Sequence, residues 1–194
     1  MRSTSLTRKT AETDIDLHLN LDGEGASSIE TGVGFFDHML TLFARHGLMD
    51  LDLTCNGDTW VDAHHTVEDV GIVLGQAFDK ALGDKAGIRR YGFLRLPMDE
   101  ALIEVALDIS GRPFLAYQVE FQEQKTGDFD AGLLEEFLRA FAMNAKITLH
   151  VNLIYGKNTH HIIEGVFKAL AKALDMATTY DRRIQGVLST KGVL

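Results

Sequence analysis

The sequence has little cysteine, little proline, no long apolar run and no excess of positive charge. Its single cysteine, Cys55, allows no intrachain disulfide, and only two prolines interrupt the 194 residues. No segment approaches the ~20 apolar residues needed to cross a bilayer. The formal net charge of −9 makes nucleic acid an unsuitable partner. Residues 1–14 lack the apolar stretch of a secretory signal, so we expect no membrane association and a cytoplasmic protein or a mature organellar form.

What the sequence does contain is the composition of a folded globular protein. Hydrophobic residues make up 45% of it and charged residues 24%, which excludes intrinsic disorder. A chain of this length can bury the core of one sizeable domain or of two small ones. Because no linker rich in proline or serine divides it, we expect residues 1–194 to form a single domain.

One short motif, His-His-x-x-Glu, here called the tetrad, occurs twice. The copies run from His64 to Glu68 and from His160 to Glu164, 96 residues apart, and each opens a stretch with helical periodicity. On a helix the glutamate lies one turn from both histidines, while the two imidazoles point about 100° apart. Neighbouring histidines are therefore better suited to two ions than to one. Imidazole with carboxylate suits a first-row divalent metal, so the doubled motif indicates a two-metal site rather than two histidine-rich helix starts at the surface.

The motif belongs to a longer duplication. Residues 12–23 align without gaps on residues 100–111, and both segments alternate apolar and polar side chains as half-buried strands do. Residues 34–44 align on residues 132–142 with helical spacing, and a short strand follows in each half. Each half therefore predicts the order strand, strand, helix, strand, helix.

This order predicts an α+β fold of two tandem pseudo-symmetric repeats, with the helices packed on one face of the sheets. The repeats cover about residues 8–88 and 89–188 and are followed by a short C-terminal tail. The spacer before the first helix is longer in the second repeat. There we expect residues 114–121 to form a returning strand and residues 122–130 a polar loop.

Six segments match motifs of one enzyme family: GVGFFDHML, DAHHTVEDVGI, RRYG, PMDEALIEVALDISGRP, LHVNLIYGKNTHHIIEGVFKAL and STKGVL. Together they run from about Arg8 to Leu194, and the chain resembles imidazoleglycerol-phosphate dehydratase of histidine biosynthesis. The resemblance implies a lyase that removes water from imidazole glycerol phosphate to give imidazole acetol phosphate. It also implies two manganese ions per site, and shells of twenty-four subunits in which neighbouring subunits share each site.

The implied reaction has a physical rationale. The leaving hydroxyl is on the carbon attached to the imidazole ring, and no carbonyl acidifies its neighbour. Deprotonation of the ring gives an imidazolate, which can expel hydroxide through a diazafulvene; a proton then leaves the next carbon and the enol becomes the ketone. Two divalent cations, one near each ring nitrogen, lower the cost of the anionic ring.

The resemblance also implies which side chains bind the metal, and we expect the two histidines of each tetrad to divide between the ions. Many family members have a further histidine in the second repeat's first helix, where this chain has Leu134-Glu135-Glu136-Phe137. The internal alignment sets Glu136 opposite His38, and a carboxylate can replace imidazole at manganese, directly or through water. His150 is predicted to be no ligand, because its repeat partner is Asp52 on the polar side of a strand. The candidate ligands are therefore His38, His64, His65, Glu68, Glu136, His160, His161 and Glu164.

Convergent cations are needed to bind a phosphate on a net-negative protein. The resemblance places this role on Arg90, Arg112, Lys168, Ser189 and Lys191. Glu12 matches a family glutamate near the substrate and is the candidate proton shuttle; its pairing with Glu100 in the repeat leaves open that both are simple strand-start residues. Together with the two tetrads, Glu12 completes the candidate catalytic set. Asp99 is expected to support the site indirectly, and His18 and His46 to belong to the scaffold.

Two other functions stay open at this point. Pairs of metal ions held by histidine and carboxylate ligands often activate water. A two-metal hydrolase of a phosphorylated small molecule is therefore the alternative enzyme. A metal-binding shell protein, in which the repeats only direct assembly, is the alternative without catalysis.

Overall fold

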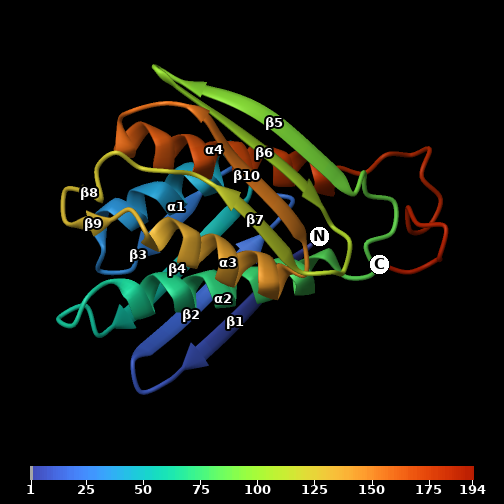
Figure 1. The fold of residues 1–194 in the computed structure, drawn as a ribbon. Helices are drawn as coiled ribbons and strands as arrows, with labels where there is room; N and C mark the ends of the chain where they lie inside the picture. The colour runs from blue at the N-terminus through green and yellow to red at the C-terminus, as the bar shows by residue number, and fades with distance from the viewer. Residues whose placement is uncertain (1) are drawn as a thin grey trace.

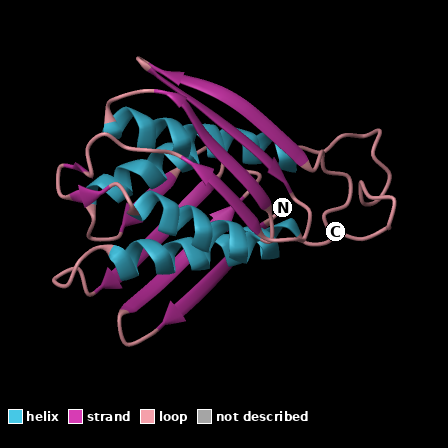
Figure 2. Ribbon diagram, in the orientation of Figure 1, coloured by secondary structure: helices cyan, strands magenta, loops and turns pink. Residues whose placement is uncertain are grey.

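Two four-stranded sheets enclose a layer of four helices (Figures 1 and 2). The structure is a computed structural model that describes residues 2–194. The first repeat contains β1 (Ser3–Lys9), β2 (Thr13–Asn20), β3 (Ser27–Glu30), α1 (Gly34–Gly47), β4 (Asp50–Gly57) and α2 (His64–Leu82). The second contains β5 (Tyr91–Met98), β6 (Ala101–Asp108), β7 (Phe114–Gln118), β8 (Lys125–Thr126), β9 (Phe129–Asp130), α3 (Leu133–Ala145), β10 (Thr148–Tyr155) and α4 (Thr159–Thr178).

Both sheets have the same topology. Their strand orders are β1-β2-β4-β3 and β5-β6-β10-β7; the last pair of each is parallel and the other pairs are antiparallel. The predicted two-repeat α+β fold is therefore confirmed. The predicted order omitted β3, because this edge strand has only four residues and Ile29 is its one large apolar side chain. Residues 122–130, predicted as a polar loop, contain the small β8–β9 hairpin.

The helices cover the inner face of each sheet. Helix α2 contacts β1 and β2, and α1 contacts β3; in the other layer α4 contacts β5 and β6, and α3 contacts β7. Buried side chains alternate with exposed ones along β2 and with half-buried ones along β6, and the buried set supplies the apolar face that the helices cover. None of the helices in residues 2–194 is long and apolar enough to cross a membrane.

The helix layer joins the two repeats. Helix α1 packs on α4, and α2 packs on α3, so each pair takes one helix from each repeat. Buried phenylalanines fill the contact, with Phe36 of α1 against Phe167 of α4 and Phe78 of α2 against Phe141 of α3. A side chain on α1 can therefore reach the start of α4, although the two helices lie more than a hundred residues apart in the sequence.

Candidate metal and active site

Helices α2 and α4 begin at the two tetrads, as the periodicity predicted. Asn158 caps α4 by accepting a hydrogen bond from the backbone N–H of His161 at 3.1 Å. In the same relative position, Asp62 accepts the backbone N–H of His64 at 2.8 Å. The side chains of each tetrad thus project from the first turn of a fixed helix.

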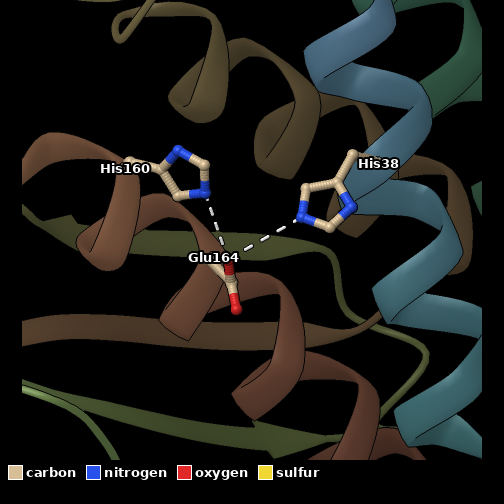
Figure 3. Close-up of side chains that lie close together, drawn as sticks. All are labelled: His38, His160 and Glu164. Carbon is tan, nitrogen blue, oxygen red and sulfur yellow. Dashed lines mark hydrogen bonds and ion pairs between the residues drawn. The ribbon is translucent and has the colours of Figure 1, made fainter.

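The second tetrad gathers a compact group of ligand atoms with the help of α1 (Figure 3). Glu164 Oε2 lies 3.2 Å from His160 Nε2 and 3.8 Å from His38 Nε2. All three ligand atoms lie within 4.8 Å of one another, and this is the one such group of three among residues 2–194. Such separations fit donors placed around a single divalent ion at about 2.1 Å. The donor set therefore suits a metal such as manganese.

Glu164 is held as a carboxylate. Its side chain is only 11% exposed, and Lys168 Nζ lies 2.5 Å from the other oxygen, Oε1. Burial raises the pKa of Glu164, but the hydrogen bonds from Lys168 and His160 outweigh it and leave the pKa below its ordinary value. Lys168 therefore stands beside the metal-ligand candidates.

The two histidines of each tetrad diverge. The ring centroids of His160 and His161 are 6.2 Å apart with the planes at 79°, and those of His64 and His65 are 6.0 Å apart at 86°. His161 Nδ1 lies 2.7 Å from Glu100 Oε2, a contact that raises the pKa of His161 and lowers that of Glu100 to about 2. Because Nδ1 is engaged, Nε2 is the ring nitrogen left for a ligand.

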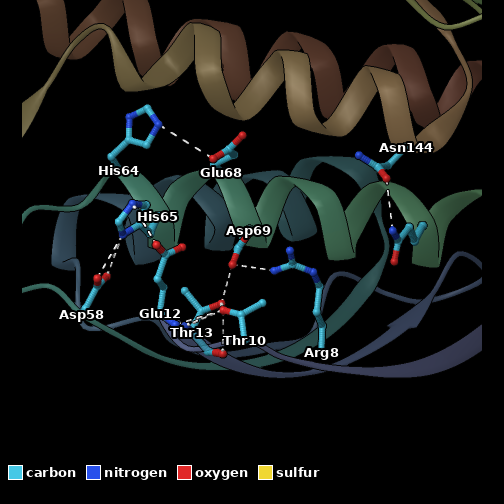
Figure 4. A network of polar contacts seen from close by, with 11 residues as sticks. Arg8, Thr10, Glu12, Thr13, Asp58, His64, His65, Glu68, Asp69 and Asn144 are labelled. Atoms are coloured by element: carbon cyan, nitrogen blue, oxygen red, sulfur yellow. Dashed lines mark hydrogen bonds and ion pairs between the residues drawn. The ribbon is translucent and has the colours of Figure 1, made fainter.

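His65 is oriented in the same way by a carboxylate that the sequence did not single out. Asp58 is buried, and its two oxygens lie 3.1 and 3.0 Å from His65 Nδ1 (Figure 4). This hydrogen bond raises the pKa of His65. Carboxylates of this kind commonly fix the ring of a metal-binding histidine. The one sequence signal for Asp58 is its position directly after β4 and shortly before the first tetrad.

The first tetrad is more open than the second. His64 Nε2 lies 3.8 Å from Glu68 Oε2, and each side chain is 44% exposed. Glu136, the predicted eighth ligand, is half-buried on α3, the helix that packs on α2. It makes no hydrogen bond or ion pair within residues 2–194, and it does not complete a group of three ligand atoms there.

Most of the predicted phosphate-binding residues gather near the C-terminal tail. Arg90 donates two hydrogen bonds to Asp108, at 2.6 and 3.0 Å, and a third to the Leu188 carbonyl at 2.7 Å. Arg112 Nη2 lies 3.9 Å from the same Asp108. Arg90 and Ser189 line a pocket of about 690 Å³, and Lys191 is exposed nearby in the tail.

These residues and the metal-ligand group occupy opposite ends of the molecule. The backbone N–H of Arg90 bonds the carbonyl of Ala177, near the end of α4, whereas His160 lies in the helix's first turn. At 1.5 Å per residue, the helix between them is about 25 Å long. Only Lys168, of the five phosphate candidates, lies at the metal-ligand end.

Of the remaining residues predicted from the sequence, His150 and His18 lie away from these groups, whereas Asp99 lies beside His161. His150 is exposed on the outer face of the second sheet, level with Ala106 and Ala116 of the neighbouring strands. Asp99 is 75% exposed, with Oδ2 3.8 Å from His161 Nε2. His18 contacts Ser5 Oγ on the outer face of the first sheet.

Comparisons with known proteins agree with one another. The family model for imidazoleglycerol-phosphate dehydratase matches residues 31–174. Imidazoleglycerol-phosphate dehydratase of Acetivibrio thermocellus is 62% identical over 193 residues, covering 100% of this chain and 99% of that protein; the Caldanaerobacter subterraneus enzyme is 60% identical over 194 residues and the whole of both chains.

Solved structures match as well. That of the Staphylococcus aureus enzyme of this name superposes with a TM-score of 0.85 at 42% identity, covering 92% of this chain and 99% of that one. The Pyrococcus furiosus enzyme, in complex with (S)-C348, gives a TM-score of 0.84 at 37% identity, covering 97% and 100%.

The duplicated fold and these matches define an enzyme, a dehydratase of histidine biosynthesis. The chain belongs to the imidazoleglycerol-phosphate dehydratase family, as the sequence motifs predicted.

Proposed function

We propose that this chain converts imidazole glycerol phosphate to imidazole acetol phosphate and water, in the cytoplasm, as a homo-oligomer of twenty-four subunits with two manganese ions per site. Family membership supports the reaction. The group formed by His38, His160 and Glu164 is the observation that carries the metal requirement, because its donors and spacing suit a divalent ion.

The chain's own residues would divide the work. His38, His160 and Glu164 would hold one ion; His64 and Glu68, with Glu136, are the corresponding set on the helix pair α2–α3. Bound ions supply Lewis acidity that favours loss of the imidazole ring proton. The carboxylates of Asp58 and Glu100 hold His65 and His161 by Nδ1, so that each ring presents Nε2.

Glu12 is the group proposed to move a proton. Its Oε1 lies 3.7 Å from His65 Nε2, and its side chain is 53% exposed. A carboxylate that is free of strong hydrogen bonds and beside the ligand set can accept the proton from the carbon that neighbours the one losing its hydroxyl.

A complete site is proposed to combine copies of the chain. The metal-ligand group and Arg90 are separated by about 25 Å of helix within one chain. The short glycerol moiety that joins imidazole to phosphate cannot bridge that length. The metal-ligand end of one copy would therefore meet Arg90, Arg112, Ser189 and Lys191 of another, while Lys168 acts from the metal-ligand end. Metal binding would then also stabilise the assembly.

The direct test is an assay with imidazole glycerol phosphate and Mn²⁺ that measures imidazole acetol phosphate and inorganic phosphate in parallel. We expect the acetol phosphate alone, and its loss in His160→Ala but not in the surface control His150→Ala. Release of inorganic phosphate would instead identify a hydrolase. Metal uptake without either product would identify a metal-binding shell protein.

Manganese titration tests the ligand assignment. We expect two ions per chain, with one weakened or lost in Glu136→Ala and the count unchanged in His150→Ala. The reverse pattern would overturn the assignment made from the repeat.

A further inference from the structure

A buried polar cluster lies beside the first tetrad, between the first sheet and α2, and the proposed reaction does not use it. Asp69 directly follows Glu68, and its side chain is 9% exposed. Its Oδ2 accepts a hydrogen bond from Thr13 Oγ1 at 2.5 Å and forms an ion pair with Arg8 Nη1, also at 2.5 Å. The cluster therefore ties β1, β2 and α2 together at one point (Figure 4).

The same point supports the turn that carries Glu12. Thr10 Oγ1 accepts the backbone N–H groups of Glu12 and Thr13 at 3.1 and 3.0 Å, and Asp58 donates its backbone N–H to the Glu12 carbonyl at 3.0 Å. The turn is thus held through its backbone and through Thr13. The carboxylate of Glu12 accepts no hydrogen bond within residues 2–194 and stays beside His65.

The second repeat has no such cluster. The residues that correspond to Arg8, Thr13 and Asp69 are Leu96, Ala101 and Gly165. A side chain at Gly165 would displace the end of the Ile103 side chain, since its Cβ would lie 2.4 Å from Ile103 Cδ1.

In the second repeat the glutamate itself holds the turn. Glu100, the counterpart of Glu12, accepts hydrogen bonds from His161 Nδ1 at 2.7 Å and from the backbone N–H groups of Asn158 and Lys157 at 2.8 and 3.2 Å. Its carboxylate is therefore fully engaged. The first repeat achieves the same attachment with other residues and keeps its glutamate free.

Stability alone does not account for the ion pair between the buried Asp69 and the half-buried Arg8. Removing an ion pair from water costs about as much as the pair returns, and apolar side chains of similar size often replace such a pair without loss. The second repeat shows that the same strands and helix pack with apolar residues at these positions.

We propose that Asp69, acting with Arg8 and Thr13, is a positioning residue for Glu12. It fixes the β1–β2 turn on the helix that carries the first tetrad, so that the Glu12 carboxylate faces His65 without being bound in place. The inference rests on the proposed role of Glu12 in proton transfer.

The matched comparison is Asp69→Asn against Asp79→Asn. Asp79 lies on the same helix, about 15 Å further along, and binds Lys85 Nζ and Lys146 Nζ at 2.9 and 2.6 Å. We expect Asp69→Asn to lower kcat roughly 10- to 100-fold with KM and manganese content nearly unchanged, because a small misplacement of a reacting group is enough. Asp79→Asn should leave kcat within about twofold.

Hydrogen exchange gives a readout that is independent of turnover. In metal-free protein, amides of residues 10–13 should exchange faster in Asp69→Asn than in the wild type, and should be unchanged in Asp79→Asn. Thr13→Val, which removes only the hydroxyl, should reproduce the effect if Asp69→Asn folds poorly, and Arg8→Lys should retain more activity than Arg8→Met.

A double-mutant cycle decides whether Asp69 acts through Glu12. In a Glu12→Gln background, Asp69→Asn should cause little further loss of kcat. A fully additive loss, a loss of manganese through the adjacent Glu68, or equal effects of Asp69→Asn and Asp79→Asn would overturn the proposal. A wild type that is inactive on imidazole glycerol phosphate would instead refute the proposed function. An active wild type with a fully active Glu12→Gln variant would leave the proposed reaction standing but refute the proton-transfer role of Glu12, and with it the positioning role of Asp69.

Discussion

The two repeats share a backbone but treat their tetrads differently. In the second repeat Glu164 is buried against Lys168 and Glu100 is bound to His161. In the first, Glu68 is 44% exposed, and Glu12 lies 3.7 Å from His65 Nε2 without accepting a hydrogen bond within residues 2–194. Duplication thus reproduces the helix start and the histidine pair. Substitutions on neighbouring elements then decide which carboxylate is structural and which is available to a substrate.

The outer faces of the sheets differ as well. One row across the second sheet contains Phe93, Ala106, His150 and Ala116, with Phe93 51% exposed. The corresponding row of the first sheet contains Ser5, His18, Asp52 and Ser28. The two repeats therefore also differ in chemical character on the faces of the sheets that point away from the helices.

The largest expected effect comes from neutralising the buried glutamate. Glu164→Gln keeps the shape but removes the charge that faces both His38 and His160, so turnover should fall by at least about 10³-fold. Glu68→Gln, at the open tetrad, should cost less in the same steady-state assay. Equal losses would show that the two tetrads are functionally equivalent despite their different burial.

Substitution of the two corresponding glutamates, Glu12 and Glu100, should separate an effect on catalysis from an effect on stability. Glu12→Gln should lower kcat by roughly 10²-fold or more, the usual worth of a general base, without lowering the melting temperature. Glu100→Ala should lower the melting temperature of the metal-free protein, because three hydrogen bonds are lost. Calorimetry beside the activity assay checks both, and a destabilised Glu12→Gln variant would contradict the comparison.

The contact of α4 with β5 is closer than its first-repeat counterpart. A Cβ at Gly92 would lie 1.9 Å from the backbone oxygen of Ala173. Gly92→Ala should therefore lower the free energy of unfolding by about 3 kcal/mol, whereas Thr4→Ala, at the corresponding position of β1, should cost about 1 kcal/mol or less. Denaturant titration measures both values; similar losses would mean that the two layers pack alike.

The smallest expected effect on stability comes from charged pairs near the C-terminal ends of α2 and α4. Burial raises the pKa of Asp79, but the hydrogen bonds and charges of Lys146 and Lys85 lower it by more. The pKa therefore lies below its ordinary value of 3.8. The resulting stabilisation is present above that value and disappears as the pH falls through the folded pKa. Asp79→Asn should cost about 1 kcal/mol near pH 7.

The control is Asp175→Asn, which removes a single half-exposed pair with Lys172 on the same helix and should cost about 0.3 kcal/mol. Thermal melts between pH 3 and 7 should show the Asp79 difference shrinking toward acid. A difference that is independent of pH would exclude the charge as its cause.

The sequence alone determined the duplication, the helices at both tetrads and the enzyme family. These follow from short-range periodicity and from motifs whose residues are close together in the chain, so no long-range contact had to be known. The sequence pattern did not predict β3, a four-residue edge strand with one large apolar residue, because so short a segment shows no clear alternation.

Only the tertiary structure decided which side chains meet. His38 reaches Glu164 because α1 packs on α4 from the other repeat, and Asp69 meets Arg8 because α2 lies on β1. Asp58 and Asp69 were not singled out, since an aspartate before or after a motif looks the same whether it is solvated or buried. The distance between Arg90 and the metal-ligand group likewise depends on the length and direction of α4. The spacing of residues in the sequence does not show how different elements are placed in space.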